Sequence, residues 1–189
     1  MTKRSRSGNT AAESSAFILE SLARIVAEER SGEIKESVDI LTSAKKLFVY
    51  GVGRSGLTAR AFAMRMVQLG LECFFIGETI TPVVGDGDAV LIVSNTGSTM
   101  SAIQVANIAR RVGSRVISVT GHRTSKLAHA SNVVLLIHTN EDADRPRLAP
   151  LATLFEDASL ILLDGLVAQV MERMGQTEAE MRGRHAIMV

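Results

Sequence analysis

The sequence predicts a three-layer α/β fold, in which a five-stranded parallel sheet carries helices on both faces. Five short apolar runs, bounded by glycine or polar residues, have the character of strands that are buried on both sides. Segments with apolar residues at helical spacing separate these runs. Because strands that alternate with helices form βαβ crossovers, we expect all five strands to be parallel.

The N-terminal part of the chain is expected to be helical. Residues 1–10 are polar and are expected to be flexible, while residues 11–189 are expected to form one domain. Apolar residues recur at helical spacing over residues 11–29, and they share one face over residues 33–43. These two segments predict an N-terminal arm of two helices.

Strands and helices alternate over the rest of the chain. The expected strands are residues 47–50, 72–76, 89–93, 115–119 and 132–137. The expected helices are residues 55–69, 99–112, 125–130, 150–174 and 178–184. Gly113 directly after the second of these helices is a typical stop signal. The polar residues 140–147 predict a loop.

Length and composition exclude several classes of protein. At 189 residues the chain has the size of one domain, and 46% hydrophobic with 22% charged residues excludes wholesale disorder. The 21 basic and 20 acidic residues, with 4% aromatic residues and no Trp, argue against nucleic-acid or anionic-membrane partners. The longest apolar stretch, residues 158–171, is interrupted by Asp164 and is too short to span a membrane. Since no leader segment is visible either, we expect a cytoplasmic protein.

The loop after the first strand has a glycine pattern that is typical of ligand-binding turns. Residues 51–56 read GVGRSG and match G-x-G-x-x-G, with Glu78 beyond the next strand as a candidate ribose contact. A dinucleotide site would use Gly51, Gly53, Gly56 and Glu78. A phosphate site at the helix N-terminus and a turn that merely allows tight packing are the alternatives. The motif lacks a Walker lysine, which argues against nucleoside triphosphate hydrolysis.

The loop after the third strand favours a phosphate ligand. Residues 94–99 read SNTGST and place four hydroxyl groups around Gly97, directly before a helix. Hydroxyls of Ser94, Thr96 and Thr99, together with amides of the helix N-terminus, are donors that suit a phosphate. If the strand order is 2-1-3-4-5, both loops meet at the switch point of the sheet. A helix cap without any ligand is the alternative.

Three ionisable side chains are candidates for the chemistry. Arg54 lies between the glycines of the first loop, where it could reach a phosphate or a sugar, or remain solvated. Glu156 lies among apolar residues near the start of the predicted helix 150–174, which suits a general base or acid; complementing the helix dipole is the alternative. His185 lies in an apolar tail that we expect to dock onto another surface, and it could transfer protons near neutral pH.

Metal and disulfide chemistry are not indicated. Cys73 is the single cysteine, so the chain can form no internal disulfide and no Cys-based metal site. His122, His129 and His138 lack ligand-like spacing and are expected to lie in loops or at the surface. We therefore predict no metal site.

Six motifs of this chain occur together in one known family. They are GVGRSG (51–56), AMRMVQLG (63–70), GETITP (77–82), SNTGST (94–99), LFEDASLILLD (154–164) and RHAIMV (184–189). Together they resemble the 6-phospho-3-hexuloisomerase family of the sugar isomerase (SIS) domain superfamily, from about Lys45 to the C-terminus. The resemblance implies a flavodoxin-like fold, a homotetramer, no metal and no organic cofactor. The predicted helix 150–174 is apolar on nearly every side, which suits a core or such a subunit interface.

The resemblance also implies an activity and roles for single residues. The family interconverts 3-hexulose 6-phosphate and fructose 6-phosphate through a cis-enediol, in the ribulose monophosphate route of formaldehyde fixation. Arg54 would lie beside the sugar, Glu156 would transfer the proton, and His185 would reach the site from a neighbouring subunit. The residues that would hold the phosphate are Gly53, Ser55, Ser94, Thr96, Gly97 and Thr99.

Two departures and two rival functions accompany this resemblance. Asn95 stands where the family has glycine, and its side chain adds bulk near the ligand. Ala152 replaces a glycine before the long helix, which affects the local backbone and so the direction of the Glu156 side chain. One rival is an SIS isomerase of another sugar phosphate, such as arabinose 5-phosphate. The other is a non-catalytic sugar-phosphate sensor. Both kinds of rival usually carry an additional domain, regulatory or DNA-binding, and this chain of 189 residues has little room for one.

Overall fold

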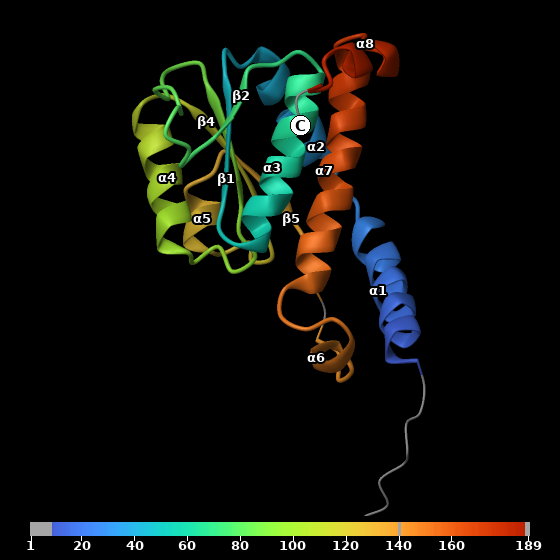
Figure 1. The fold of residues 1–189 in the computed structure, drawn as a ribbon. Helices are drawn as coiled ribbons and strands as arrows, with labels where there is room; N and C mark the ends of the chain where they lie inside the picture. Colours follow the sequence, from blue (N-terminus) through green and yellow to red (C-terminus); the bar gives the residue numbers. More distant parts are fainter. Residues whose placement is uncertain (1–8, 140, 188–189) are drawn as a thin grey trace, which may run out of the picture.

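The computed structural model describes residues 9–139 and 141–187, which form a three-layer α/β structure (Figure 1). All five strands are parallel and lie in the order β2-β1-β3-β4-β5. The strands are β1 (Leu47–Gly51), β2 (Cys73–Phe75), β3 (Ala89–Val93), β4 (Arg115–Thr120) and β5 (Val133–Leu136). The predicted fold class is confirmed, and the strand order is the one that the convergence of the two loops required.

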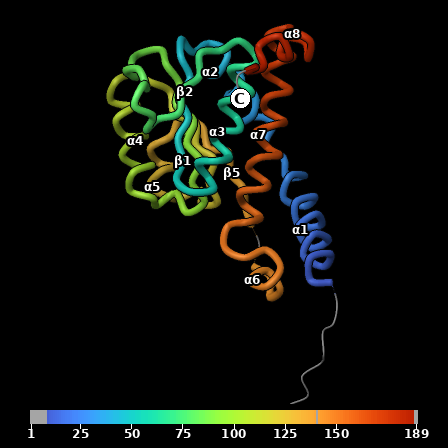
Figure 2. The backbone as a smooth tube through the Cα atoms, in the orientation of Figure 1, coloured from blue at the N-terminus to red at the C-terminus, as the bar shows by residue number. Residues whose placement is uncertain are grey.

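Helices cover both faces of this sheet. In the described residues they are α1 (Thr10–Val26), α2 (Ser31–Ser43), α3 (Arg54–Gln68), α4 (Met100–Arg111), α5 (Lys126–His129), α6 (Arg145–Leu148), α7 (Thr153–Arg173) and α8 (Glu178–Gly183). Helices α4 and α5 cover one face, whereas α2, α3 and α7 cover the other. The long helix α7 lies between α3 and α1 and runs from α6 to α8 (Figure 2). No helix within the described ranges is long and apolar enough to cross a membrane.

The sheet is buried on both faces, which explains why its strands are continuous apolar runs. Successive side chains of a strand point to opposite faces. On β3, Val90 and Ile92 pack with α4 and α5, while Leu91 and Val93 pack with the helices of the other face. All four side chains are at most 1% exposed.

The helix α1 ends at Val26, short of the predicted end at residue 29, because Arg30 turns the chain toward the sheet. The Arg30 side chain is largely buried, and its guanidinium donates hydrogen bonds of 2.7–2.9 Å to three backbone carbonyls. These carbonyls belong to Ile25, Glu28 and Leu136. The α1–α2 turn is thereby tied to the end of β5. Of the segment expected to be flexible, residues 1–8 lie outside the described residues.

The chain before α7 is not the open loop that its polar sequence predicts. Residues 145–148 form the short helix α6, with Pro146 in its first turn. Helix α7 begins at Thr153 rather than at residue 150, because Leu151 has a φ of +58°, outside the helical region. The Arg145 guanidinium donates to the Leu151 carbonyl at 2.9 Å and holds this turn beside α6.

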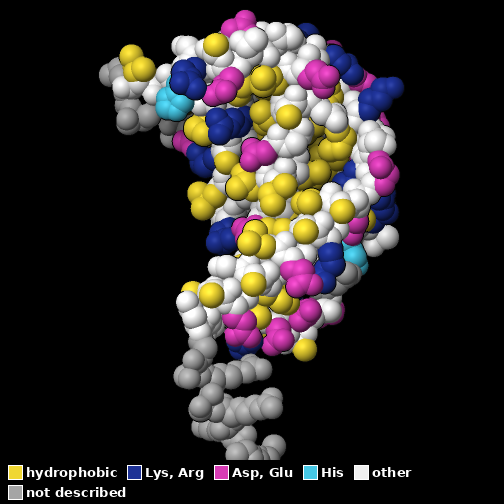
Figure 3. Space-filling view, turned by 90° about the vertical axis from the view of Figure 1, so that its right-hand side faces the viewer, with side chains coloured by type: hydrophobic (Ala, Val, Ile, Leu, Met, Phe, Trp, Pro, Cys, Tyr) yellow, Lys and Arg dark blue, Asp and Glu magenta, His cyan; other side chains and the backbone are white. Residues whose placement is uncertain are grey.

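One side of the molecule exposes apolar side chains. Figure 3 shows them gathered on the face that carries α7, with charged side chains scattered around them. On α7, Leu160 and Ile161 are 39% and 45% exposed, and on the adjacent α3, Leu57 and Met64 are 65% and 53% exposed. The apolar character of α7 on nearly every side therefore exceeds what the core of one chain buries.

Candidate active site at the switch point of the sheet

The site is built where two neighbouring strands send their helices to opposite faces of the sheet. The last residues of β1 and β3, Gly51 and Val93, are partners in the sheet. Helix α3 leaves β1 toward one face, and α4 leaves β3 toward the other. The two loops therefore meet at the carboxyl edge of the sheet, where parallel α/β folds bind ligands.

The glycines of the first loop allow a close strand-to-helix turn. A Cβ atom added at Gly56 would lie 2.6 Å from the Gly51 carbonyl oxygen, so these two residues pack directly on each other. Gly53 has a φ of +59° and precedes α3, whose first turn has no side-chain cap. The backbone amides of this turn are therefore open to an anion.

The acidic residue of the dinucleotide interpretation is already occupied. A guanidinium nitrogen of Arg60 donates to Glu78 at 2.5 Å, and the same guanidinium lies 3.6 Å from the centre of the Phe75 ring. The Glu78 carboxylate is thus held by a charged neighbour at the end of β2. Both side chains are about half exposed, so this is a surface ion pair.

The second loop brings its hydroxyl groups together in front of α4. The hydroxyls of Ser94 and Thr99 lie 3.2 Å apart, and the Thr96 hydroxyl accepts from the Ser98 hydroxyl at 2.9 Å. Thr99 precedes the first turn of α4 without capping it through its side chain. Both helix N-termini at the switch point therefore present backbone amides that no side chain caps.

A third segment, the chain between β4 and α5, packs against the second loop, although no sequence motif singles it out. The amide of Gly121 donates to the Asn95 carbonyl at 2.9 Å, and the amide of Leu127 donates to the Gly97 carbonyl at 3.0 Å. Gly97 has a φ of +57°, and a Cβ added there would lie 2.1 Å from the Ser125 hydroxyl. The β4–α5 loop (residues 121–125) thus requires glycine at position 97. Its position at the end of the strand next to β3 is the signal that could have revealed it.

Two adjoining cavities open at this edge. The first has a volume of about 170 Å³ and is lined by Val52, Ser55, Val93, Ser94, Asn95, Thr96, Thr99, Ala102 and Ala152. The second, of about 250 Å³, is lined by Asn95, His122, Thr139, Glu141, Arg145, Leu151, Ala152, Leu154 and Phe155. They share Asn95 and Ala152, the two departures from the family pattern. The residue Asn95 lies against Gly121, since a Cβ added at Gly121 would lie 2.6 Å from its amide oxygen.

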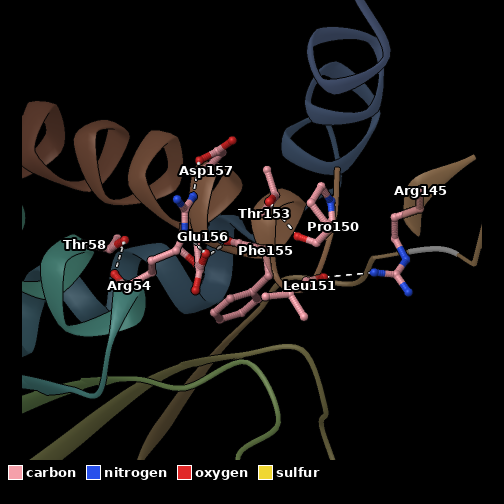
Figure 4. A network of polar contacts seen from close by, with 10 residues as sticks. Arg54, Thr58, Arg145, Pro150, Leu151, Thr153, Phe155, Glu156 and Asp157 are labelled. Atoms are coloured by element: carbon pink, nitrogen blue, oxygen red, sulfur yellow. Dashed lines mark hydrogen bonds and ion pairs between the residues drawn. The ribbon is translucent and has the colours of Figure 1, made fainter. Parts of the chain in front are cut away.

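Glu156 lies in the first turn of α7, and its carboxylate faces Arg54 instead of a purely apolar environment. The Glu156 side chain is 11% exposed, and its Oε2 accepts a hydrogen bond from Arg54 Nε (Figure 4). The other end of the guanidinium lies 3.5 Å from Asp157. The hydrogen bond and the charge of Glu156 raise the pKa of Arg54. Arg54 is therefore paired with two acidic side chains, while its own side chain is 60% exposed.

The ion pair adjoins the first cavity without lining it. The amide of Glu156 donates to the Ala152 carbonyl at 2.9 Å, so these residues lie one turn apart on the same side of α7. Arg54 precedes Ser55, which lines that cavity. Arg54 and Glu156 line a separate cavity of about 250 Å³ between α3 and α7.

His185 lies at the opposite end of α7 and does not join this group within one chain. Glu156 and the end of α7 are separated by roughly 25 Å along the helix. The neighbouring Arg184 anchors the tail, because its guanidinium donates to the Gln68 carbonyl at 3.1 Å and to the Gln176 side chain at 2.8 Å. His185 itself is exposed beside Arg65 and Met181. Met188 and Val189 of the terminal motif lie outside the described residues.

Comparison with known proteins identifies the domain. A model of the SIS domain matches residues 40–163. The chain belongs to the SIS domain family. Both glycine-containing loops and Glu156 lie inside the matched part, whereas His185 lies beyond it. In the described part of the chain, no group of three or more His, Cys, Asp or Glu side chains could hold a metal ion.

Relatives within the SIS family include isomerases of phosphorylated sugars. A 3-hexulose-6-phosphate isomerase of Methanocaldococcus jannaschii is 32% identical over 84% of this chain and 85% of its own length. A solved structure from Methanococcus jannaschii, for which the function of 3-hexulose-6-phosphate isomerase was inferred, has a TM-score of 0.82 at 28% identity and covers 90% of this chain and 98% of the other. The arabinose 5-phosphate isomerase KdsD of Pseudomonas aeruginosa is 28% identical over 77% of this chain, but over 46% of its own length.

Proposed function

We propose that this protein is a sugar-phosphate isomerase that interconverts 3-hexulose 6-phosphate and fructose 6-phosphate. One observation carries the proposal: the hydroxyl-rich loop before α4 and the buried carboxylate of Glu156 lie on either side of the first turn of α3. Isomerisation of a phosphorylated sugar needs both features, an anion site and a base within reach of it. The relatives that act on 3-hexulose 6-phosphate support this choice of sugar.

The phosphoryl group binds in the first cavity. Hydroxyl groups of Ser55, Ser94, Thr96 and Thr99 donate to its oxygens, together with uncapped amides of α3 and α4. Gly53 and Gly97 allow the tight turns of both loops, because each has a positive φ angle. Asn95 leaves room for the phosphate, because its side chain lies against Gly121.

Glu156 is the base that moves the proton. Its carboxylate removes the proton from C2 of the hexulose, the C–H electron pair forms the C2=C3 bond, and the C3 carbonyl oxygen takes up a proton from His185 of the partner subunit, which later recovers the O2 proton. The resulting cis-enediol loses its O2 proton, which forms the C2 carbonyl, and C3 receives a proton from the protonated Glu156. The bond from Arg54 holds Oε2, so that Oε1 is the oxygen that meets the substrate. Proton transfer of this kind contributes roughly 10²–10⁴-fold to a rate.

The variant Glu156→Gln tests this assignment. Ribulose 5-phosphate, formaldehyde and a hexulose-phosphate synthase generate the substrate, and a coupled dehydrogenase reports fructose 6-phosphate. We expect the wild-type chain to form product and the variant to be roughly 10²–10⁴-fold slower, with fructose 6-phosphate binding retained. Near-wild-type turnover of the variant contradicts the role of Glu156. The adjacent variant Asp157→Asn is the matched control, because Asp157 contacts the same guanidinium but has no role as base.

The same assay decides between this function and its nearest rival. An isomerase of arabinose 5-phosphate, as the relationship to KdsD suggests, would bind sugar phosphates yet form no fructose 6-phosphate here. It would instead convert arabinose 5-phosphate to ribulose 5-phosphate. A sugar-phosphate sensor would turn over neither sugar. If the wild-type chain forms fructose 6-phosphate, the protein would take its place in cytoplasmic formaldehyde fixation by the ribulose monophosphate route.

A further inference from the structure

The phosphate cavity contains no charged side chain. Its nine lining residues are hydroxyl, amide or apolar residues. A phosphate monoester carries up to two negative charges near neutral pH. Uncapped helix amides contribute only partial positive charge. A phosphoryl group bound in this cavity would therefore gain from a full positive charge close by.

The adjoining cavity contains two side chains that could supply this charge, His122 and Arg145, of which the Arg145 guanidinium is engaged by the Leu151 carbonyl. His122 lines the second cavity, which shares Asn95 and Ala152 with the first. Over the described ranges, the His122 ring makes no hydrogen bond or ion pair, so it is available to a ligand. His129 and His138 line neither cavity.

The loop that carries His122 is held firmly against the phosphate loop. The carbonyl of Asn95 accepts from the Gly121 amide at 2.9 Å and from the Thr120 hydroxyl at 3.2 Å. The amide of His122 lies 3.4 Å from the same Thr120 hydroxyl. These contacts attach the backbone at His122 to the phosphate loop, while the imidazole itself is exposed and lines the adjoining cavity.

We propose that His122 is a proton-dependent phosphate-binding residue, whose imidazolium form supplies the positive charge that the phosphate loop lacks. This inference rests on the proposed function, since it takes a phosphorylated ligand in the first cavity. An imidazole changes its charge near neutral pH. Binding of the phosphoryl group therefore takes up a proton at His122, and the resulting pair is strengthened as the pH falls.

Other charged groups surround the ring and have to be separated from it. Within the second cavity these are Glu141 and Arg145, of which Arg145 donates to the Leu151 carbonyl. The next residue of the loop, Arg123, lies 3.8 Å from Glu33 of α2. Arginines keep their charge at all relevant pH values. A carboxylate at position 141 would also favour the imidazolium, so the variant Glu141→Gln is needed to separate its effect from that of the ligand.

The test is titration calorimetry with fructose 6-phosphate and with inorganic phosphate, at about pH 6 and about pH 8. The wild-type chain, His122→Gln, His122→Lys and the control His129→Gln are compared. We expect His122→Gln to bind roughly 5–10-fold more weakly than the wild type at about pH 6 and about equally at about pH 8. The phosphate itself loses charge toward pH 6, but this loss is common to all variants and cancels in the ratio. His122→Lys should bind tightly at both pH values.

Proton uptake gives an independent readout. Near neutral pH, titrations in two buffers with different heats of ionisation should show more proton uptake by the wild type and by His129→Gln than by His122→Gln. Glu141→Gln should retain the uptake. The role of His122 would be overturned if the ratio of wild-type to His122→Gln affinity is the same at both pH values and both proteins take up equal numbers of protons. The phosphate site itself would remain intact. Failure of the wild-type chain to bind either ligand would overturn the proposed function together with this inference.

Discussion

At the scale of single residues, the space beside a glycine decides whether a side chain is allowed at the site. Gly97 combines a positive φ with the Ser125 hydroxyl in the space where its Cβ would lie. Gly175, two residues after the end of α7, has a similar φ of +63°, but nothing lies within 4 Å of an added Cβ. The two glycines therefore separate the cost of the backbone conformation from the cost of contact.

The variant Gly97→Ala should lose about 2–4 kcal/mol of unfolding free energy, from backbone strain and from overlap with Ser125. The control Gly175→Ala should lose about 1–2 kcal/mol, from backbone strain alone. Urea unfolding measures both values. Equal losses in the two variants would mean that Ser125 moves away without cost. The phosphate loop would then not depend on the β4–α5 loop.

At the scale of secondary structure elements, α8 is held by local contacts and by one anchor. No residue of α8 is buried. Its capping box consists of the Thr177 hydroxyl, which accepts from the Glu180 amide at 3.3 Å, and the Glu180 carboxylate, which accepts from the Thr177 amide at 2.7 Å. Arg184 then fixes the following tail to the end of α3. The position of His185 depends on these contacts.

The variant Thr177→Ala should reduce the hydrogen-exchange protection of α8 roughly fivefold, because a helix cap is lost. Thr177→Ser is the control and should keep the protection. The hydrogen bond from the Thr177 side chain lowers the pKa of Glu180, so the cap forms above the unfolded-state pKa. Protection of α8 should therefore fall as the pH drops through the lowered pKa. Unchanged protection in Thr177→Ala would show that Arg184 alone holds the segment.

At the scale of the whole molecule, one chain separates two groups that the proposed reaction brings together. Glu156 and His185 lie near opposite ends of α7, while apolar side chains are exposed along α7 and α3. We propose that a second copy packs on this face within a homotetramer and brings its His185 to the site. A patch of exposed apolar side chains suits such an interface.

Mixing of inactive chains tests this assembly. Glu156→Gln and His185→Ala should each be inactive or slow, and refolding them together should restore activity through sites that combine an intact Glu156 with an intact His185. Mixing Glu156→Gln with Glu156→Ala is the control and should restore nothing. A mixture that stays inactive although native mass spectrometry shows mixed oligomers would rule out a shared site.

The sequence by itself determined the layers and the two loops of the switch point, because periodicity and glycine placement act over a few residues. The strand order entered only as a condition, and the tertiary structure supplied it. It also identified Glu156 as a buried carboxylate. Only the tertiary structure decided what these groups face. Arg54 meets Glu156 although 102 positions separate them, and the β4–α5 loop with His122 lies beside the phosphate loop. Such contacts join residues far apart in the chain, and no local pattern encodes them. The late start of α7 has the same origin, since Arg145 of α6 holds the turn at Leu151.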